Sequence, residues 1–414
     1  MINIQNLSMN QYLPLLTLFS FIHTLLFSLL ITQYHTKIIE HFFIYLNISN
    51  MYKMALIHSV IMNLPRIYFI ISTDLYTQST FINGFSATYL SLGMGLVILT
   101  AHYKTLIRFE SFLKDIFALT GGLAIQALCL NGWQITPLHI RTAGLIFSIY
   151  LSLTLRLKYS PNRQNPQVTA RMPFLFLKNI NEFTTRHIYD LIILNLDNFH
   201  KQSIYTSMQI LFSPVINTVV LLLYFKPIKD TQKILLSLFI SFFTGLILMK
   251  SSKKQNSQII NYFYGLISSI FYITIFLDRS RLLIDHIGMF ISKKFLDTVV
   301  SPVTMGFPEF LHLIYHSRRT SSSMSACSII NSNIFTTLCF GYLKRYFTGN
   351  NQNIVYSGDQ VSVSFGTISV AVMFFNYIMK NQKLSKDLGS ILIFIYFMFV
   401  MTFVLDYDKF IKKY

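Results

Sequence analysis

Long apolar runs recur along the chain and are separated by short polar segments. Segments 13–32, 143–155 and 388–405 contain almost no ionisable side chains. A helix needs about 20 mainly apolar residues to cross the roughly 30 Å of hydrocarbon in a bilayer. These runs therefore predict helices that cross a membrane. The first eleven residues contain no Lys or Arg, so the first run lacks the basic region of a secretory signal and is expected to be a retained span.

The pattern predicts an all-α, polytopic integral membrane protein with about twelve transmembrane helices. Their expected ranges are 12–33, 52–73, 83–102, 112–131, 136–157, 204–225, 233–250, 257–277, 289–316, 323–346, 361–380 and 387–406. A polar, proline-containing segment, 158–203, divides them into an N-terminal membrane half (1–157) and a C-terminal membrane half (204–414). No separate folded soluble domain is expected.

Composition supports a membrane protein and accounts for the charge. Hydrophobic residues make up 53% of the chain and charged residues 12%, against about 25% charged residues in soluble domains. The net charge of +18 would suggest nucleic acid in a soluble protein. Here the bases cluster at span ends, as in 250–254, where the positive-inside rule explains them. The expected partners are the lipid bilayer and small inorganic ions, with no nucleic acid.

Loop charge predicts the orientation of the spans. The basic segments 103–111, 158–203 and 381–386 are expected on the cytosolic side, and the N-terminus and 74–82 on the opposite side. The bases of 226–233 and 409–413 fit this arrangement less well, so the span count is open by one. The sequence indicates neither which membrane holds the protein nor its oligomeric state.

Two spans share a motif. Segment 62–66 reads Met-Asn-Leu-Pro-Arg and segment 305–309 reads Met-Gly-Phe-Pro-Glu, and each is followed about twenty residues later by small polar residues, at 84–88 and 331–333. The two spans are predicted to run in opposite directions, which is typical of inverted-repeat transporters. A proline in mid-membrane frees a carbonyl group, which is tolerated where it lines a cavity or is buried in protein. The alternative is a simple kink in each of two ordinary helices.

These residues resemble a known superfamily. Pro308-Glu309 and the 331–335 segment, Asn-Ser-Asn-Ile-Phe, resemble the second conserved repeat of the sodium/calcium exchanger superfamily. Segments 324–327, 112–117 and 389–396 are similar to its cation/calcium exchanger branch, which includes the mitochondrial-type sodium/calcium/lithium exchangers. The resemblance implies the inverted-repeat exchanger fold, with repeats at about 52–102 and 289–346. It also implies secondary active transport of a cation by alternating access at a midplane site.

The resemblance and the two prolines direct attention to oxygen-bearing side chains on these helices. The candidate ion ligands are Glu309, which is the candidate metal-binding carboxylate, and Thr304, Asn331, Ser332, Asn333, Asn63, Ser86 and Thr88. Calcium takes six to eight oxygen ligands and usually more than one carboxylate. Arg66 stands where the family carries an acid, and the thioethers of Met62 and Met305 are poor calcium ligands. No cofactor is expected, and calcium, sodium, another monovalent cation or the proton stays open as the transported ion, with tight calcium binding disfavoured.

Arg66 and Glu309 are expected to form an ion pair. An ionisable residue inside a span normally faces the bundle interior and has a partner, and these two occupy equivalent places in the two repeats. In a transporter the pair would open when a cation or proton competes for Glu309. The alternative is a permanent structural ion pair in a non-transporting membrane scaffold, where Tyr89, Met62 and Met305 would fill the cavity.

Three histidines are weaker candidates for a functional role, and each also has a purely structural explanation. His58 is either a proton relay or a satisfied buried histidine, and His312 and His316 are either a metal-binding pair or a pair at a helix end. The three cysteines are expected to be inert core residues. No serine-histidine-acid set, phosphate loop or pair of catalytic carboxylates was found, so no enzyme is predicted.

Overall fold

The computed structural model describes most of the helical parts of the chain. The described residues are 38, 39, 43, 48, 50–72, 75–101, 105–132, 134, 135, 137–157, 204–224, 231–252, 258–288, 292–319, 322–340, 354, 355 and 360–405. The predicted span 12–33 and the loop 158–203 lie outside them. The chain divides into two compact units: Met1–Leu25 with Ser49–Thr169 and Leu277–Tyr414, and Leu26–Ile48 with Ala170–Phe276.

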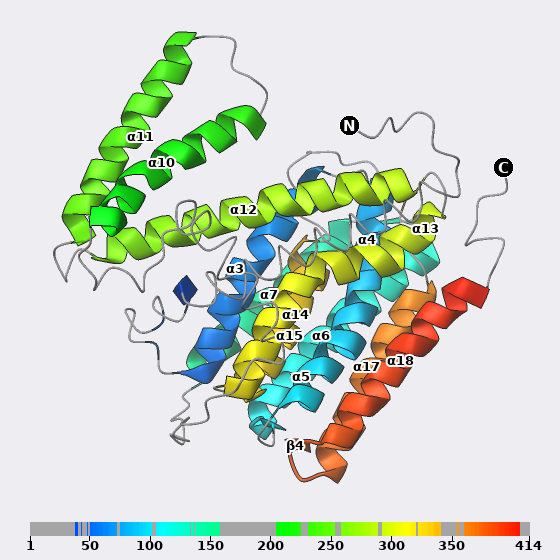
Figure 1. Cartoon of the computed structure of the whole chain (residues 1–414). Helices are drawn as coiled ribbons and strands as arrows, with labels where there is room; N and C mark the ends of the chain where they lie inside the picture. Colours follow the sequence, from blue (N-terminus) through cyan, green and yellow to red (C-terminus); the bar gives the residue numbers. More distant parts are fainter. Residues whose placement is uncertain are drawn as a thin grey trace. The chain divides into compact units, whose positions relative to one another are not determined.

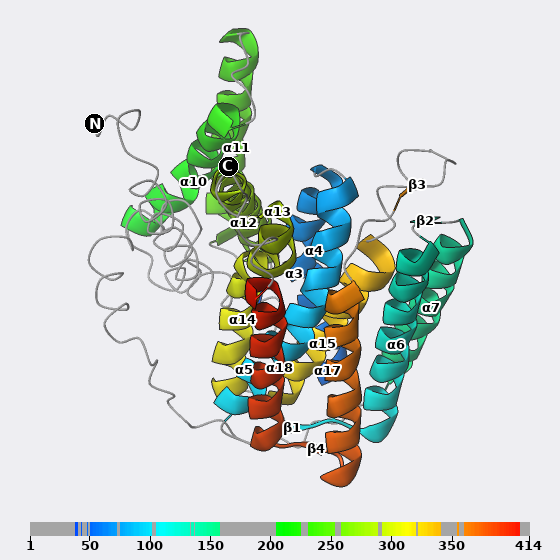
Figure 2. The same cartoon turned by 90° about the vertical axis from the view of Figure 1, so that its right-hand side faces the viewer.

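The first unit is a helical bundle (Figures 1 and 2). Its helices are α3 (Met51–Ser72), α4 (Leu75–Thr88), α5 (Met94–Thr100), α6 (Phe109–Gly132), α7 (Pro137–Arg156), the end of α12 (Gln258–Ile287), α13 (Lys293–Phe295), α14 (Ser301–Arg319), α15 (Ser322–Ile334), α17 (Gln360–Met379) and α18 (Lys386–Leu405). π-Helical turns occupy Tyr89–Gly93, Leu296–Val300 and Phe335–Phe340. Two short antiparallel pairs join β1 (Thr105–Leu106) to β4 (Lys383–Leu384) and β2 (Gln134–Ile135) to β3 (Ile354–Val355).

The second unit contains α10 (Ile204–Tyr224), α11 (Thr231–Ser252) and the first part of α12. Asn217 is its polar centre. The Asn217 amide donates to the Tyr264 hydroxyl at 2.6 Å and to Ser268 Oγ at 2.9 Å, and its carbonyl accepts from the Tyr272 hydroxyl at 2.7 Å. These bonds satisfy the amide inside an apolar helical unit, where an unpaired polar group would be costly.

The helices follow the predicted spans from residue 52 onward. Within the described residues, seven helices are long and apolar enough to cross a membrane, and the chain is a multi-pass integral membrane protein. Three predicted segments differ in extent. Helix α12 runs about ten residues beyond 257–277, and α14 starts after a π-helical turn inside 289–316. Residues 75–82, predicted as part of a loop before the span 83–102, are helical and belong to α4. The count of twelve spans stays a prediction.

Helices α3 and α14 run in opposite directions, as the repeat predicted. The start of α3 lies beside β1, because the Arg108 N–H donates to the Tyr52 hydroxyl at 3.1 Å. The end of α14 lies there too, because α15 starts three residues later and the Leu106 N–H donates to Ser323 Oγ at 3.1 Å. Figure 2 shows β1 and β4 together at one end of the bundle.

The two repeats are interleaved. Helix α3 packs chiefly against α15, while α14 packs against α4 and α5 as well as its own partner α15. Each proline-containing helix thus lies on the second helix of the other repeat. Both second helices pass into a π-helical turn, after Thr88 and after Ile334, and such turns are frequent at functional sites.

Gly84 provides a test of this crossing. A methyl group on Gly84 of α4 would lie 1.9 Å from the Thr298 carbonyl oxygen, so the two segments would have to separate. We predict that Gly84→Ala lowers the free energy of unfolding by at least about 1–3 kcal/mol, the usual cost of overpacking. Gly144→Ala is the matched control, because a methyl group there meets nothing within 4 Å. Thermal unfolding in detergent measures both, and equal melting temperatures for the two variants would contradict the packing.

Candidate functional site

Arg66 and Glu309 form an ion pair where the two repeats cross. Arg66 Nη2 contacts Glu309 Oε2, and their side chains are 2% and 0% exposed. This confirms the predicted pairing of two residues 243 positions apart. Breaking a buried pair strands a charge and costs about 3–5 kcal/mol, so each residue holds the other in place.

Hydrogen bonds from three elements complete the surroundings of the pair. The Tyr89 hydroxyl donates to Glu309 Oε2 at 2.8 Å and itself accepts from Arg66 Nη2. Ser332 Oγ donates to Glu309 Oε1 at 2.5 Å, and Arg66 Nη1 donates to Asn63 Oδ1 at 2.8 Å. Both carboxylate oxygens therefore have donors, which matches the hydrogen-bonding capacity of an ionised acid.

Aromatic rings enclose the guanidinium group. The guanidinium carbon of Arg66 lies 4.8 Å from the ring centroids of both Phe85 and Tyr89, within the range of a cation–π contact. The two rings stack at 3.7 Å, and Phe310 packs against Tyr89 at 4.5 Å. Tyr89 fits because Gly306 has no side chain: a Cβ there would lie 2.5 Å from the Tyr89 ring.

Several predicted ligands meet around this pair. Glu309, Ser332 and Asn63 belong to it directly, as described above. Ser86 and Asn333 follow Phe85 and Ser332 in the sequence and are joined by a hydrogen bond of 3.2 Å between Ser86 Oγ and Asn333 Oδ1. All five side chains are buried, and their role as ion ligands stays a prediction.

Three other candidates do not reach Glu309 by any hydrogen bond within the described residues. The Thr304 hydroxyl donates to the carbonyl of Val300 on the preceding turn at 2.9 Å. Asn331 is hydrogen-bonded to the Tyr150 hydroxyl of α7, and Thr88 Oγ1 is buried with no hydrogen-bond partner in the described part of the chain. The role of each of these residues as an ion ligand stays a prediction.

The charge of the cluster is balanced without a bound ion. Glu309 supplies one negative charge and Arg66 one positive charge, and Ser332, Asn63 and Tyr89 are neutral donors or acceptors. Across the described residues, no group of three or more His, Cys, Asp or Glu side chains is placed to hold a metal ion. The ring centroids of His312 and His316 lie 4.5 Å apart with the rings tilted by 57°, and His312 stacks on His58 at 4.4 Å, so the three belong to a row of buried rings.

A second buried ion pair was not expected from the sequence. Lys114 Nζ lies 2.5 Å from Asp115 Oδ1 on α6, and both side chains are buried. Lys114 also donates to Thr154 Oγ1 at 2.7 Å and lies 4.2 Å from the Tyr150 ring centroid. The sequence contained a sign of this pair, because Lys114 and Asp115 lie inside a predicted span, where ionisable residues need partners. Through Tyr150 this pair is connected to Asn331.

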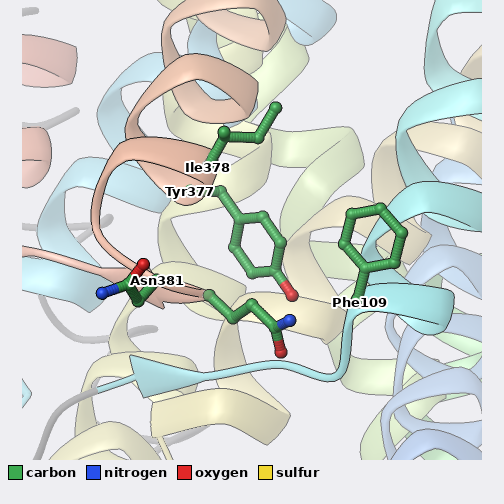
Figure 3. A pocket seen from close by; sticks show the side chains of 5 residues that line it. Phe109, Tyr377, Ile378 and Asn381 are labelled. Atoms are coloured by element: carbon green, nitrogen blue, oxygen red, sulfur yellow. The ribbon is translucent and has the colours of Figure 1, made fainter.

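A separate pocket of about 240 Å³ lies at the β1–β4 end of the bundle and is lined by Phe109, Tyr377, Ile378, Asn381 and Gln382 (Figure 3). The Tyr377 and Phe109 rings lie near each other, with centroids 6.5 Å apart. The Tyr377 hydroxyl donates to the Ile107 carbonyl at 2.7 Å. The lining contains no carboxylate and none of the predicted ion ligands. Cys129 and Cys327 are buried thiols, and Cys129 Sγ lies 3.4 Å from His139 Nδ1.

The comparisons with solved structures place the fold. The sodium-calcium exchanger NCX_Mj, soaked with 100 mM Na⁺ and 10 mM Sr²⁺, aligns with a TM-score of 0.53 and 12% identity over 94% of this chain and 98% of its own. The same exchanger, soaked with 2.5 mM Na⁺ and 1 mM Sr²⁺, aligns with a TM-score of 0.53 and 13% identity over 92% of this chain and 97% of its own. The H⁺/Ca²⁺ exchanger CAX aligns with a TM-score of 0.49 and 13% identity over 93% of this chain and 86% of its own. No family model and no curated protein matches the sequence.

The class of protein follows from these findings. The chain is a helical, multi-pass membrane protein with the fold of a sodium-calcium exchanger, at an identity that establishes the fold alone. The resemblance drawn from segments 305–309 and 331–335 is thus confirmed at the level of fold. The mitochondrial-type branch stays a hypothesis.

Coupling between Arg66 and Glu309 can be tested by a double-mutant comparison. Arg66→Ala alone should destabilise the protein by about 3–5 kcal/mol, because it strands the Glu309 charge. Arg66→Ala combined with Glu309→Gln should be less destabilised than Arg66→Ala alone. The measurement is thermal unfolding in detergent of wild type, both single variants and the double variant. Additive losses would show that the two residues are independent.

Proposed function

We propose that this protein is a secondary active transporter that moves a cation across the membrane by alternating access, with Glu309 as its cation-binding carboxylate. The observation that carries the proposal is the enclosed Arg66–Glu309 pair at the crossing of two antiparallel repeats. Midplane sites at a repeat interface are where such transporters bind substrate and coupling ions. In this proposal Arg66 is a built-in cation that occupies the site until an external cation or proton replaces it.

Charge balance favours a singly charged ion over calcium. With Arg66 present, the cluster is neutral, so a bound monovalent cation leaves one uncompensated positive charge and calcium leaves two. Uncompensated charge in a low-dielectric interior costs several kcal/mol. Calcium also prefers more than one carboxylate, and Glu309 is the one carboxylate among the hydrogen-bonded residues of this cluster. The proposed cargo is therefore a monovalent cation or the proton.

The same side chains can serve both states of the site. The hydroxyls of Ser332 and Tyr89 donate to Glu309 while the pair is closed, and a hydroxyl oxygen also has lone pairs that can face a bound cation. The Asn63 carbonyl oxygen, which accepts from Arg66 in the closed pair, is a further oxygen ligand. The faces of Phe85 and Tyr89 offer the displaced guanidinium a cation–π contact.

A specific observation favours the alternative of a non-transporting scaffold. Tyr89 packs against Gly306 where a Cβ would collide with its ring, and Met62 and Met305 are 5% and 2% exposed. Of these, Tyr89 is hydrogen-bonded to Glu309, and all three side chains are buried. A scaffold would keep this arrangement permanently, whereas a transporter must open it to one side of the membrane in part of its cycle.

Replacing the built-in cation tests the charge argument. We expect wild type to bind calcium weakly, and Arg66→Asp to bind calcium at least about tenfold more tightly, because the cluster changes from neutral to doubly negative. Arg141→Asp is the matched control, since it makes the same change of net charge at an exposed position on α7. The measurement is calcium binding to purified protein. Tight binding by wild type, or an equal gain in the control, would contradict the argument.

Reconstitution separates the two candidate functions. Liposomes containing the full chain should move sodium, potassium or protons down an imposed gradient, and Glu309→Gln should abolish that flux. A folded wild type that moves none of these ions would favour the scaffold.

A further inference from the structure

Three buried histidines form a continuous row beside the ion pair. His58 of α3 stacks on His312 of α14, with ring centroids 4.4 Å apart and an interplanar angle of 19°. His312 in turn contacts His316, with centroids 4.5 Å apart. Their side chains are 0%, 0% and 4% exposed. Ionisable side chains inside a membrane bundle cost free energy to bury, and they commonly mark functional sites.

The row extends from the β1 end of the bundle towards Glu309. His312 follows Glu309 by three residues and His316 by seven, so all three side chains lie on one face of α14. His316 is three residues from the end of α14 at Arg319, and that end lies near β1. A helix C-terminus favours a positive charge, so a protonated His316 is stabilised at the outer end of the row.

Hydrogen bonds connect the inner end of the row to the ion pair. His58 Nδ1 lies 2.6 Å from Ser328 Oγ, and Ser328 Oγ lies 3.1 Å from Ser59 Oγ. The Asn63 amide donates to the Ser59 carbonyl at 2.6 Å, and the same Asn63 accepts from Arg66. A change in charge on the rings is therefore transmitted to the residues that orient Arg66.

We infer that the row of His58, His312 and His316 is a proton-binding site, and that the proton is the ion coupled to transport at Glu309. This inference rests on the proposed transport function. A proton from water at the β1 end binds one ring nitrogen of the row, and rings in contact disfavour a second proton because two imidazolium charges repel. The charge on the row then acts on Arg66 through the chain of hydrogen bonds that starts at His58. This weakens the hold of Arg66 on Glu309, so the site can open.

The neighbouring groups leave the histidines as the natural proton acceptors. The described elements that carry the row or pack against it hold further titratable side chains: Tyr52, Lys53 and Arg66 on α3, Tyr89 between α4 and α5, Asp297 in the π-helical turn before α14, Glu309, Tyr315 and Arg318 on α14, Cys327 on α15, and His139, Arg141, Tyr150 and Arg156 on α7. Histidine is the side chain whose ordinary titration falls between pH 5 and 8. His58 and His312 stack face to face, and His316 is tilted against His312. The described residues form no cluster suited to a metal ion.

Proton flux in liposomes tests the inference. The full chain is reconstituted with a pH-sensitive dye inside, and a sodium or potassium gradient is imposed. In wild type, cation movement should change the internal pH. His312→Gln should reduce the proton flux at least about tenfold, because one ring nitrogen can no longer accept and pass on a proton, and His58→Gln should act in the same direction. His139→Gln, on α7 and outside the row, is the matched control and should leave the flux unchanged.

The outcomes separate this inference from the proposed function. Cation flux with no change of internal pH overturns the proton coupling and leaves a transporter. Unchanged proton flux in a folded His312→Gln variant overturns the role of the row. A wild type that moves no cation overturns both. If His312→Gln melts at a lower temperature than wild type, His316→Gln, at the outer end of the row, takes its place in the comparison.

Discussion

A charged pair enclosed in a membrane protein must be matched, because either charge alone would cost several kcal/mol in a low-dielectric interior. Arg66 and Glu309 meet this requirement with each other, and their neighbours complete it: Tyr89 and Ser332 donate to the carboxylate, while Asn63 accepts from the guanidinium. The arrangement needs helices from both repeats to approach closely. The close packing of Gly84 on the Thr298 backbone and of Gly306 on the Tyr89 ring is therefore part of the same requirement.

The interleaving of the two repeats determines which residues surround the Arg66–Glu309 pair. Because α3 lies on α15 and α14 lies on α4 and α5, each proline-containing helix places its ionisable residue against the polar residues of the other repeat. In inverted-repeat transporters, substrate and ion sites lie at such a repeat interface. Here one of the two equivalent positions holds a permanent positive charge, so the fold of a sodium-calcium exchanger is combined with a neutral centre. That combination is the physical basis for proposing a singly charged cargo.

Polar chemistry in this bundle is connected over several helices. The row of histidines reaches the pair through Ser328, Ser59 and Asn63, and the Lys114–Asp115 pair reaches Asn331 through Tyr150. In an apolar bundle each such group needs a partner, so polar residues gather into networks. A change of protonation or ion occupancy at one group then acts on the others through bonds that must be remade.

The sequence by itself predicted most of the described helices, the opposite directions of α3 and α14, and the Arg66–Glu309 pair. A span is a local property of about 20 apolar residues, and the shared proline motif put two opposite charges at equivalent depths, where each needed a partner. Only the tertiary structure decided that Asn331 faces Tyr150 and that Thr304 bonds to the π-helical turn before α14. It also decided that the three histidines form one row and that Lys114 lies over an aromatic ring. These contacts depend on the rotation and register of helices far apart in the sequence, which hydropathy and spacing do not encode.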